Sequence, residues 1–382
     1  MSTLQQRTWA EINLDNIEHN YKVIRNHIGK KVRFLGVVKA NAYGHGSVPV
    51  AQVLQELDCE YLATATIEEA ILLRENGITT PILILGYTSP AYTADLIHYG
   101  ITQTIADLHT AQEMSQICSQ VKKKLKVHLK ADSGMGRLGF ICRNGKDPSE
   151  DMLAVMKLSG LDVEGIFTHF AVSEVLDDAY TQTQYQDFSD LCNKLEKKYG
   201  QKFAIRHCAN SGAMLNYNQM HGDMVRPGIA LYGYPPGPGL CDIGLRPVMG
   251  LKTRIVHIKE LSPGDSVSYG RKFRATEARK IAVLSIGYAD GLHRVLSNQC
   301  EFLLHGKRIA QLGNICMDMC MADITNVPDA EIGDPVTIFG TDSGISITVD
   351  ELADLAGTIS YELLCAVSPR VPRVYYRNGT LL

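Results

Sequence analysis

The stretch VVKANAYGHG, residues 37–46, ends an apolar run on a lysine and continues with a tyrosine and two glycines. A short apolar run such as residues 34–38 is typical of a parallel strand that is buried on both faces. Lys39 follows where the strand should leave the core. An ammonium group at that point either reaches back to water or has a function, and the rest of the sequence has to decide between the two.

Short apolar strands alternate with amphipathic helical segments from residue 34 to about residue 232. The predicted strands cover residues 34–39, 61–66, 82–86, 101–106, 126–131, 163–169, 203–209 and 224–226. A helix with one apolar face is predicted before them, over residues 14–28. Eight strands, each followed by a helix or a tight turn, predict an α/β fold, namely a TIM (β/α)8 barrel. A doubly wound open sheet is the alternative, because strand order cannot be read from the sequence.

The pattern changes after residue 240. The segment PPGPG breaks the chain, and β-rich pieces such as KIAVLSIGYADG and EFLLHGKRIAQLG follow, with one evident helix in VDELADLAG. We therefore expect a barrel domain over residues 1–240 and a mainly β domain over residues 241–382. The first ten or so residues are candidates for packing with the C-terminal domain.

Composition excludes several functional classes. Of the 382 residues, 45% are hydrophobic and 21% charged, with a net charge of −3, so the chain has no basic surplus for binding nucleic acid or an anionic membrane. The first sixteen residues lack the apolar core of a signal peptide, and we expect a cytoplasmic protein. The ten cysteines form no CxxC pair, and no metal site is expected.

The segment SGMGRLG matches GxGxxG at Gly134, Gly136 and Gly139. A dinucleotide-binding fingerprint requires a helix to begin there. The sequence that follows, FICRNGKDPS, is typical of a turn. We therefore do not expect a dinucleotide site at these glycines.

Polar residues gather at the C-terminal ends of the predicted strands, where a TIM barrel builds its active site. They are Lys39, Asp132 with Arg137, His169, Asn210 with Ser211, and Arg226. Each alone is explained by a solvated strand end. Together they predict one site at one mouth of the barrel.

The turn after Arg226 is Pro227-Gly228-Ile229. In TIM barrels the turns after strands seven and eight commonly bind phosphate through backbone N–H groups, and Ser211 and the Gly228–Ile229 backbone stand in those turns. A phosphate site, a buried lysine and an arginine suggest pyridoxal 5'-phosphate (PLP), held by the lysine as a Schiff base.

These residues carry a resemblance that extends over essentially the whole chain. The matching segments are AEINLDNIEHN, VVKANAYGHG, LKADSGMGRLGF, THFA, ANSGA, RPGIALYG, VSYG, SIGYADG, GNICMDM and the ISYELL–RVPRVY end. In this order and spacing the chain resembles bacterial alanine racemases, which are PLP enzymes of the barrel-fold type.

The resemblance implies a role for each matching residue. Lys39 would hold the cofactor aldehyde, and Arg226, supported by His169, would face the pyridine nitrogen. Arg137 would meet the phenolic oxygen of the cofactor and the carboxylate of the substrate. The phosphate would be bound by Tyr43, Ser211, Gly228, Ile229 and Tyr361. A second subunit would contribute Tyr269, Met317 and Asp318.

The implied activity interconverts L-alanine and D-alanine by two-base proton transfer on a PLP aldimine, and supplies D-alanine for peptidoglycan. Lys39 would serve one face of the substrate. Tyr269 would serve the other, provided that nearby cations lower its pKa from about 10. The active unit would be a homodimer with shared sites. A serine racemase or a broader amino-acid racemase of the same family is the alternative.

Lys130 lies close to Asp132 and Arg137 in the sequence. In some alanine racemases this lysine is carbamylated, which creates an anion that positions the arginine. The alternative is an ordinary salt bridge between Lys130 and Asp132.

Three readings from other classes remain open. A PLP-dependent amino-acid decarboxylase of similar architecture would usually place an acidic group at the ring nitrogen, where this chain offers Arg226. A single-domain PLP carrier would not need residues 241–382. A barrel without catalytic function would have no reason to gather Lys39, Arg137, His169 and Arg226 at one mouth.

Overall fold

The computed structural model describes residues 6–237, 239 and 241–382. The chain divides into two compact units, each described by itself below. The barrel unit comprises residues 17–42 and 47–246. The β unit comprises the described residues up to Asn16, then Tyr43–Gly46 and Pro247–Leu382. Within the part of the chain that the structure describes, no helix is both long and apolar enough to cross a membrane.

The barrel unit is built on eight parallel strands that neighbour one another in a single path, β10-β2-β3-β4-β5-β6-β8-β9. Their bounds are β2 Arg33–Val37, β3 Tyr61–Thr64, β4 Ile82–Ile84, β5 Ile101–Ile105, β6 Leu125–Asp132, β8 Leu161–Phe167, β9 Ile205–His207 and β10 Met224–Val225. A two-residue strand, β7 (Phe140–Ile141), is attached to the side of β6.

The path closes into a ring. The Asp223 N–H donates to the carbonyl of Arg206 over 2.8 Å, and the Arg226 N–H donates to the carbonyl of Ala209 over 2.9 Å. These bonds join β10 to β9. A doubly wound open sheet would instead reverse its strand order at a switch point. The predicted TIM barrel is therefore confirmed, and the open sheet is excluded.

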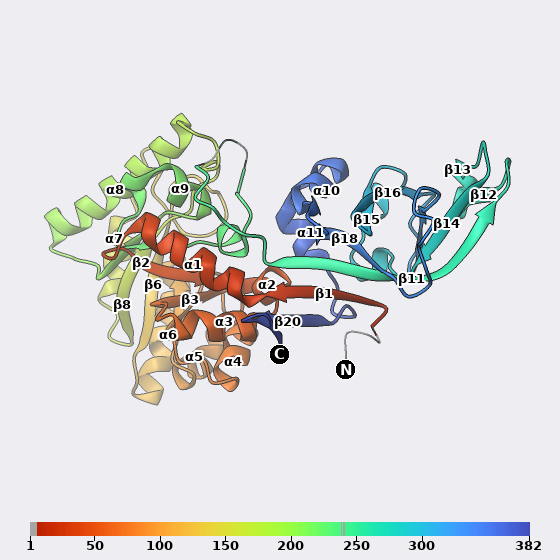
Figure 1. Cartoon of the computed structure of the whole chain (residues 1–382). Helices are drawn as coiled ribbons and strands as arrows, with labels where there is room; N and C mark the ends of the chain where they lie inside the picture. Colours follow the sequence, from red (N-terminus) through yellow and green to blue (C-terminus); the bar gives the residue numbers. More distant parts are fainter. Residues whose placement is uncertain (1–5, 238, 240) are drawn as a thin grey trace. The chain divides into compact units, whose positions relative to one another are not determined.

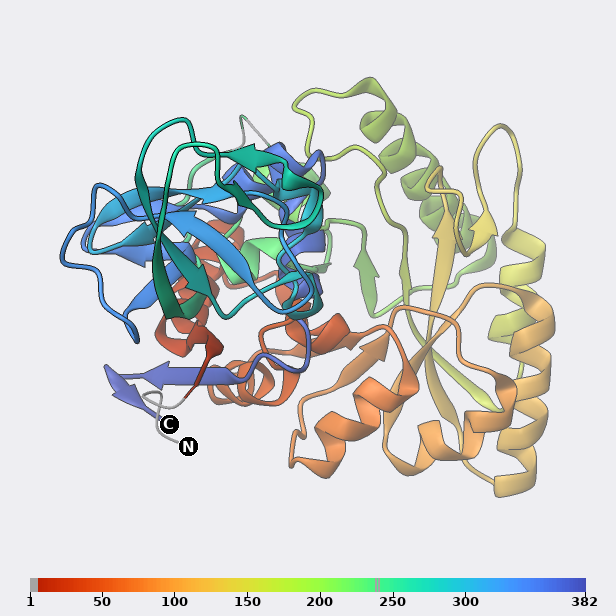
Figure 2. The ribbon, with the colours of Figure 1, turned by 90° about the vertical axis from the view of Figure 1, so that its right-hand side faces the viewer.

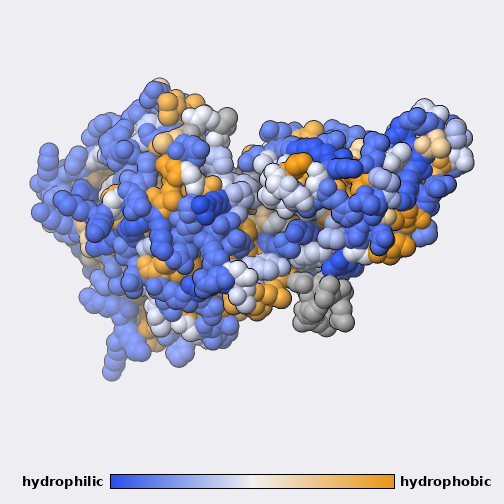
Figure 3. Space-filling model, viewed as in Figure 1, coloured by the Kyte–Doolittle hydropathy of each residue, from blue (hydrophilic) through white to orange (hydrophobic). Residues whose placement is uncertain are grey.

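Helices surround the strands of the barrel unit (Figures 1 and 2). They are α1 Leu14–Ile28, α3 Ser47–Glu56, α4 Ile67–Glu75, α5 Thr93–His98, α6 Leu108–Val121, α7 Ser149–Met156, α8 Ala179–Tyr199 and α9 Ser211–Asn216. Five of them begin at side chains that accept a backbone N–H of the first turn, as N-caps commonly do: Asn13, Thr66, Asp107, Asp178 and Asn210. The surface of the barrel unit that is visible in Figure 3 is mostly hydrophilic, as expected when helices turn their apolar faces toward the strands.

The β unit contains a sheet whose order is β19-β18-β15-β16-β17-β14-β11-β1-β20-β21. The bounds are β1 Thr8–Asn13, β11 Met249–Leu261, β14 Arg279–Leu284, β15 Glu301–Leu304, β16 Lys307–Leu312, β17 Cys320–Asp323, β18 Pro335–Asp342, β19 Ile345–Ile347, β20 Arg373–Arg377 and β21 Thr380–Leu381. Strand β11 also pairs with β18, so six of these strands form a closed ring that leaves no free edge between β18 and β11. The predicted mainly β C-terminal domain is confirmed.

Strand β1 pairs with β11 and β20 in this sheet, so the start of the chain contributes a strand to the β unit. One feature of the unit differs from the prediction. A single helix was expected, at VDELADLAG, and the structure has two, α10 (Val349–Ala356) and α11 (Ser360–Ala366). The second is only seven residues long and bears no side-chain N-cap, so it lacks the local signals by which a helix is predicted.

A short hairpin, β12 (Ser266–Val267) and β13 (Phe273–Arg274), projects a loop over residues 268–272. Val267 belongs to a small hydrophobic cluster with Leu261, Ala275, Ile281, Leu312 and Met321, and Phe273 packs against it. Both ends of the loop are therefore anchored in a core of their own.

Candidate functional site

The residues predicted at the barrel mouth lie at or just beyond the C-terminal ends of the strands. Lys39 follows β2, Arg137 lies in the loop after β6, His169 follows β8, Ser211 begins the helix after β9, and Arg226, Gly228 and Ile229 follow β10. Lys130 is in β6 itself and is buried. Lys39 and His169 are half-buried, and Arg137 is exposed. The structure thus gathers these residues at one end of the barrel unit.

The backbone after Lys39 forms a left-handed helical turn. Ala40, Asn41, Ala42 and Tyr43 have φ angles of 53°, 53°, 54° and 52°. For residues with a Cβ this conformation costs roughly 1–2 kcal/mol each. Such strain persists only where surrounding contacts impose it, and it clusters at functional sites.

Glu69 supplies part of that restraint. One oxygen of its carboxylate accepts the Ala40 N–H over 2.6 Å, and the other accepts the Ala65 N–H over 2.8 Å. The Asn41 side chain accepts the Ser47 N–H over 2.8 Å. The residue next to Lys39 is therefore tied to the end of the neighbouring strand β3, which fixes the direction in which the chain leaves β2.

Arg226 is 3% exposed and its guanidinium is surrounded by acceptors. Nη2 donates to the carbonyls of Thr168 (2.8 Å) and Cys208 (3.0 Å) and contacts Nδ1 of His169 (3.2 Å). Nη1 lies 2.9 Å from Nδ1 of His207. Burial lowers the pKa of Arg226 to about 10, so the group stays cationic at neutral pH and can only donate.

Several cations act on one another at this mouth. Burial, and then the charges of Arg137 and Arg226, lower the pKa of Lys130 to about 8. Burial and the same two arginines, together with Lys130, hold the pKa of His169 well below its usual value. A region that accumulates positive charge in this way favours an anionic ligand.

Ser211 organises the turn after β10. Its buried hydroxyl accepts the Gly228 N–H over 2.9 Å and the Ala230 N–H over 3.4 Å. The Ser211 hydroxyl and the backbone N–H groups of the turn after β10 thus converge, an arrangement that suits a phosphate.

Tyr43 and Tyr361 both belong to the β unit, where their ring centroids are 5.9 Å apart. Burial, and then Tyr361, raise the pKa of the Tyr43 hydroxyl, so Tyr43 remains a hydrogen-bond donor at neutral pH. Gly44 follows at φ +82°, and a Cβ there would lie 2.4 Å from the carbonyl of Leu364. Only glycine fits this approach to α11.

Tyr269 is 73% exposed at the tip of the hairpin loop. The backbone on both sides is left-handed, with φ 66° at Ser268 and φ 71° at Gly270. Ser268 Oγ donates to the Asn314 carbonyl over 2.6 Å, and Asn314 Nδ2 donates to the Tyr269 carbonyl over 2.7 Å. The loop thus presents its phenol to solvent from a restrained backbone.

Met317 and Asp318 lie in the exposed turn between β16 and β17. Arg370 connects this turn to a buried carboxylate, because it pairs with Asp318 over 2.7 Å and with Asp290 over 3.1 Å. Asp290 also pairs with Arg7 over 2.5 Å and accepts the Gly287 N–H over 3.0 Å. Asp290 therefore holds two arginines and, through Arg370, the position of Asp318.

We expect Asp290→Asn to destabilise the β unit by about 2–4 kcal/mol, since two guanidinium groups would lose a buried anionic partner. Thermal unfolding of the full chain measures the loss. Asp329→Asn, which removes a carboxylate from an exposed turn of the same unit, should change stability by less than about 0.5 kcal/mol. Equal stability of the two variants would contradict the role given to Asp290.

The sequence-based prediction missed Glu69, His207, Asp290 and Arg370. His207 had a usable signal, because it lies two residues after the apolar Ile205 and every second residue of a barrel strand points inward. Glu69 also had one, because it stands three residues after Thr66 at the spacing of a capping box. The bonds from Glu69 to Ala40, from Asp290 to Arg7 and from Arg370 to Asp318 had none, since these partners are distant in the sequence. The predicted alternative of a salt bridge between Lys130 and Asp132 is not found in the structure: the Asp132 carboxylate accepts the N–H groups of Gly134 and Gly136 and lies near Arg143.

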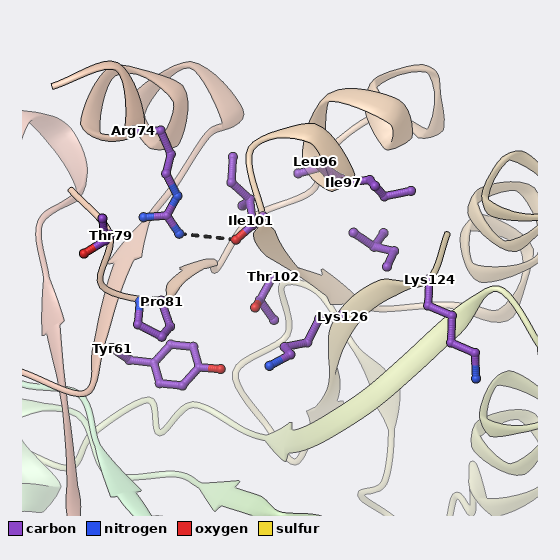
Figure 4. Close-up of a pocket in the computed structure, with 12 residues that line it drawn as sticks. Tyr61, Arg74, Thr79, Pro81, Leu96, Ile97, Ile101, Thr102, Lys124 and Lys126 are labelled. Atoms are coloured by element: carbon purple, nitrogen blue, oxygen red, sulfur yellow. Dashed lines mark hydrogen bonds between the residues drawn. The ribbon is translucent and has the colours of Figure 1, made fainter. Parts of the chain in front are cut away.

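A hollow of about 250 Å³ lies elsewhere, where β3, β5 and β6 begin (Figure 4). Arg74 lines it but donates to the carbonyls of Ile78, Thr80, Tyr99 and Gly100. Since these bonds pin the surrounding loops, the arginine is structural. The hollow is at the opposite end of the strands from Lys39.

Comparison with known proteins gives consistent matches to both units. Residues 12–236 match the family described as "Alanine racemase, N-terminal domain", and residues 248–375 match "Alanine racemase, C-terminal domain". "Alanine racemase 2" of Caldanaerobacter subterraneus subsp. tengcongensis is 46% identical over 97% of this chain and 95% of the relative. The alanine racemase of Desulforamulus reducens is 43% identical over 97% of this chain and 100% of the relative.

Solved structures agree. The alanine racemase of Clostridium difficile 630 has a TM-score of 0.93 and 40% identity, covering 99% of this chain and 98% of that one. The alanine racemase of Bacillus anthracis with bound L-Ala-P has a TM-score of 0.91 and 34% identity, covering 100% of this chain and 98% of that one.

Proposed function

This chain belongs to the alanine racemase family and is an amino-acid racemase, and from that premise we propose that it interconverts L-alanine and D-alanine with PLP bound through Lys39. The observation that carries the cofactor proposal is the cationic barrel mouth, where a lysine, two arginines and a hydroxyl meet at the strand ends. PLP offers a phosphate, a phenolic oxygen, an aldehyde and a ring nitrogen, which would be matched by Ser211, Arg137, Lys39 and Arg226 in that order.

The phosphate is assigned to the Ser211 hydroxyl and the N–H groups of Gly228 and Ile229. By the family resemblance Tyr43 and Tyr361 also donate to it. Lys39 Nζ would hold the aldehyde carbon of the cofactor, and the left-handed turn that follows fixes the backbone from which this amine extends. Arg137 is placed to meet the phenolic oxygen and the carboxylate of the substrate.

When bound, PLP stabilises the negative charge that develops at the substrate Cα as its proton leaves. Two groups then have to hold protons on opposite faces. We assign Lys39 Nζ to one face and Tyr269 Oη to the other. Arg226, which can only donate, directs an N–H at the pyridine nitrogen and keeps that nitrogen from being protonated.

Lys130 is proposed to be carbamylated. Its pKa of about 8 leaves part of the amine neutral near neutral pH, and a neutral amine is the form that reacts with carbon dioxide. The product would be an anion beside Arg137 and Arg226, which would offset the accumulated positive charge. Asp132 does not fill that role, because its Oδ1 accepts two N–H groups of the loop and its Oδ2 pairs with Arg143.

The active unit is proposed to be a homodimer in which Tyr269, Met317 and Asp318 complete the partner's site. Tyr269, Tyr288, Met317, Met319 and Ile359 are large apolar or aromatic residues of the β unit that are 42–73% exposed. Exposed apolar groups of this size are common at protein interfaces. D-Alanine produced by such an enzyme would supply peptidoglycan synthesis in the cytoplasm.

Mixing two inactive variants tests the shared site. A Lys39→Ala chain and a Tyr269→Phe chain, carrying different tags and co-expressed, should regain activity, because one site of each hybrid contains both intact residues. Random pairing makes half of the dimers hybrid with one working site each, so about a quarter of the parent activity is expected. Purified hybrids without activity would mean that each site is built from one chain.

A further inference from the structure

A line of hydrogen-bonded side chains runs through the interior of the barrel unit, away from the mouth. Arg226 Nη1 lies 2.9 Å from His207 Nδ1, and His207 Nε2 lies 2.9 Å from His128 Nδ1. His128 Nε2 then lies 3.1 Å from Glu164 Oε2. Both imidazoles are fully buried. The line connects the strand end that carries Arg226 with the middle of β8, where Glu164 lies.

The polarity of this line follows from chemistry. Because an arginine can only donate, His207 Nδ1 must accept, and the proton of that ring must be on Nε2. His207 Nε2–H therefore donates to His128 Nδ1, and His128 Nε2–H donates to Glu164. Burial and the neighbouring Arg226 hold the pKa of His207 well below its usual value, and burial lowers that of His128, so both rings are neutral. All protons point from the guanidinium toward the carboxylate.

Glu164 is built to remain an anion. Burial acts to raise its pKa, but hydrogen bonds from His128, Tyr61 and Lys126 outweigh this and lower the pKa to about 2. The Tyr61 hydroxyl donates to Oε2, and Lys126 Nζ lies 3.0 Å from Oε1. Tyr61 and Lys126 point toward one another beside the hollow of Figure 4, and the Glu164 side chain that they bind is 20% exposed.

Two packing features hold the imidazoles in line. The Phe167 ring stacks on His207, with centroids 4.7 Å apart and planes 11° apart. Gly165 leaves room for His128, since a Cβ at that position would lie 2.7 Å from the His128 ring. Among the described residues, the hydrogen-bond acceptors of Arg226 are carbonyl oxygens and histidine nitrogens, and none is a carboxylate. The carboxylate to which the line connects Arg226 is that of Glu164, at its other end.

We propose that Glu164 is a positioning residue for racemisation, which orients the Arg226 guanidinium through His128 and His207. The proposal rests on the proposed function, in which Arg226 faces the pyridine nitrogen. Arg226 sets both tautomers, and Glu164 accepts the proton that points outward from His128. By anchoring the far end of the line, Glu164 fixes the positions of both rings, hence the direction of the Nη1–H bond and the edge of the guanidinium that remains for the cofactor. The alternative is a purely structural role, in which the line only gives buried polar side chains their hydrogen-bond partners and has no effect on the reaction.

The test is Glu164→Gln, with Asp162→Asn as a matched control that removes a carboxylate from an exposed site on the same strand. In the glutamine variant, Tyr61, Lys126 and His128 would compete for one amide oxygen. We expect kcat to fall by about ten- to a hundredfold, with KM changed less than about twofold, as for a misplaced catalytic group. Asp162→Asn should keep the parent kcat, and Glu164→Asp should recover part of the loss.

A second readout needs neither cofactor nor activity. In the cofactor-free full chain labelled with ¹⁵N-histidine, His128 and His207 should each show a single Nε2–H tautomer. In Glu164→Gln the Nε2 signal of His128 should shift, because that N–H loses its anionic acceptor. Variants of each histidine assign the signals. If the parent chain lacked PLP-dependent activity, the proposed function would fail while this measurement still decided whether the line exists.

Gly165→Ala provides a variant that leaves the carboxylate in place but displaces His128, and it should lower kcat to a similar extent. If Glu164→Gln does not fold, the kcat of Gly165→Ala tests the proposal in its place. Parent kcat in a folded Glu164→Gln or Gly165→Ala chain would overturn the proposal. So would an equal loss in Asp162→Asn, or a kcat loss in Glu164→Gln with the Nε2 signal of His128 unchanged.

Discussion

Lys39→Ala is expected to lower the rate of alanine racemisation by about a thousandfold or more, because the variant loses both the bond to the cofactor and the proton carrier of one face. Borohydride reduction of the PLP-loaded parent should attach the cofactor covalently, and peptide mapping should place it on Lys39. The variant should retain no covalent label. Racemisation is measured as loss of optical activity from either enantiomer of alanine.

Lys157→Ala is the matched control, since Lys157 is an exposed lysine of the same unit that follows α7. It should keep both the label on Lys39 and the parent rate. A Lys39→Ala chain that turned over alanine at the parent rate, or a label on another lysine of the parent, would remove the basis for the proposed site.

Arg226→Glu is expected to slow racemisation by about a hundredfold or more. A glutamate would accept a hydrogen bond where the arginine donates, so the pyridine nitrogen would become protonated. The variant would also leave the carbonyls of Thr168 and Cys208 without their donor. The nitrogen chemical shift of ¹⁵N-labelled PLP reports the protonation, and the unfolding temperature reports the structural cost separately.

Arg226→Lys is the control, because lysine keeps the charge and the ability to donate but lacks the fork of the guanidinium. It should leave the ring nitrogen unprotonated and lose less activity than the glutamate variant. An unchanged nitrogen shift in a folded, PLP-loaded Arg226→Glu chain would mean that Arg226 does not face the ring nitrogen.

Much of the barrel could be predicted because its strands are short apolar runs bounded by turns. The segments that contain β2, β5 and β8 were all predicted near their observed bounds. Lys39, His169 and Arg226 were placed at strand ends by the same pattern. Such signals depend on residues within one or two turns of each other, and a sequence displays them directly.

The conformation after Lys39 could not be predicted. Asn41 tolerates left-handed backbone better than most residues, but Ala40 and Ala42 on either side of it do not, and the local energetics oppose a run of four such residues. The turn exists because distant groups hold it, such as the Glu69 carboxylate that accepts the Ala40 N–H. The short helix α11 was also missed by the sequence-based prediction, because this helix has no side-chain N-cap that would mark its start in the sequence.

By itself, the sequence determined the succession of strands and helices, the break near residue 240 and the residue types at the strand ends, because each depends on neighbours along the chain. Tertiary structure decided which strands close the ring and which side chains meet inside it. Arg7 and Asp290 are 283 positions apart, and His128 and His207 are 79 apart. Partners at such separations are chosen by the folded backbone, since no local propensity encodes a contact between segments that meet only after the chain has folded.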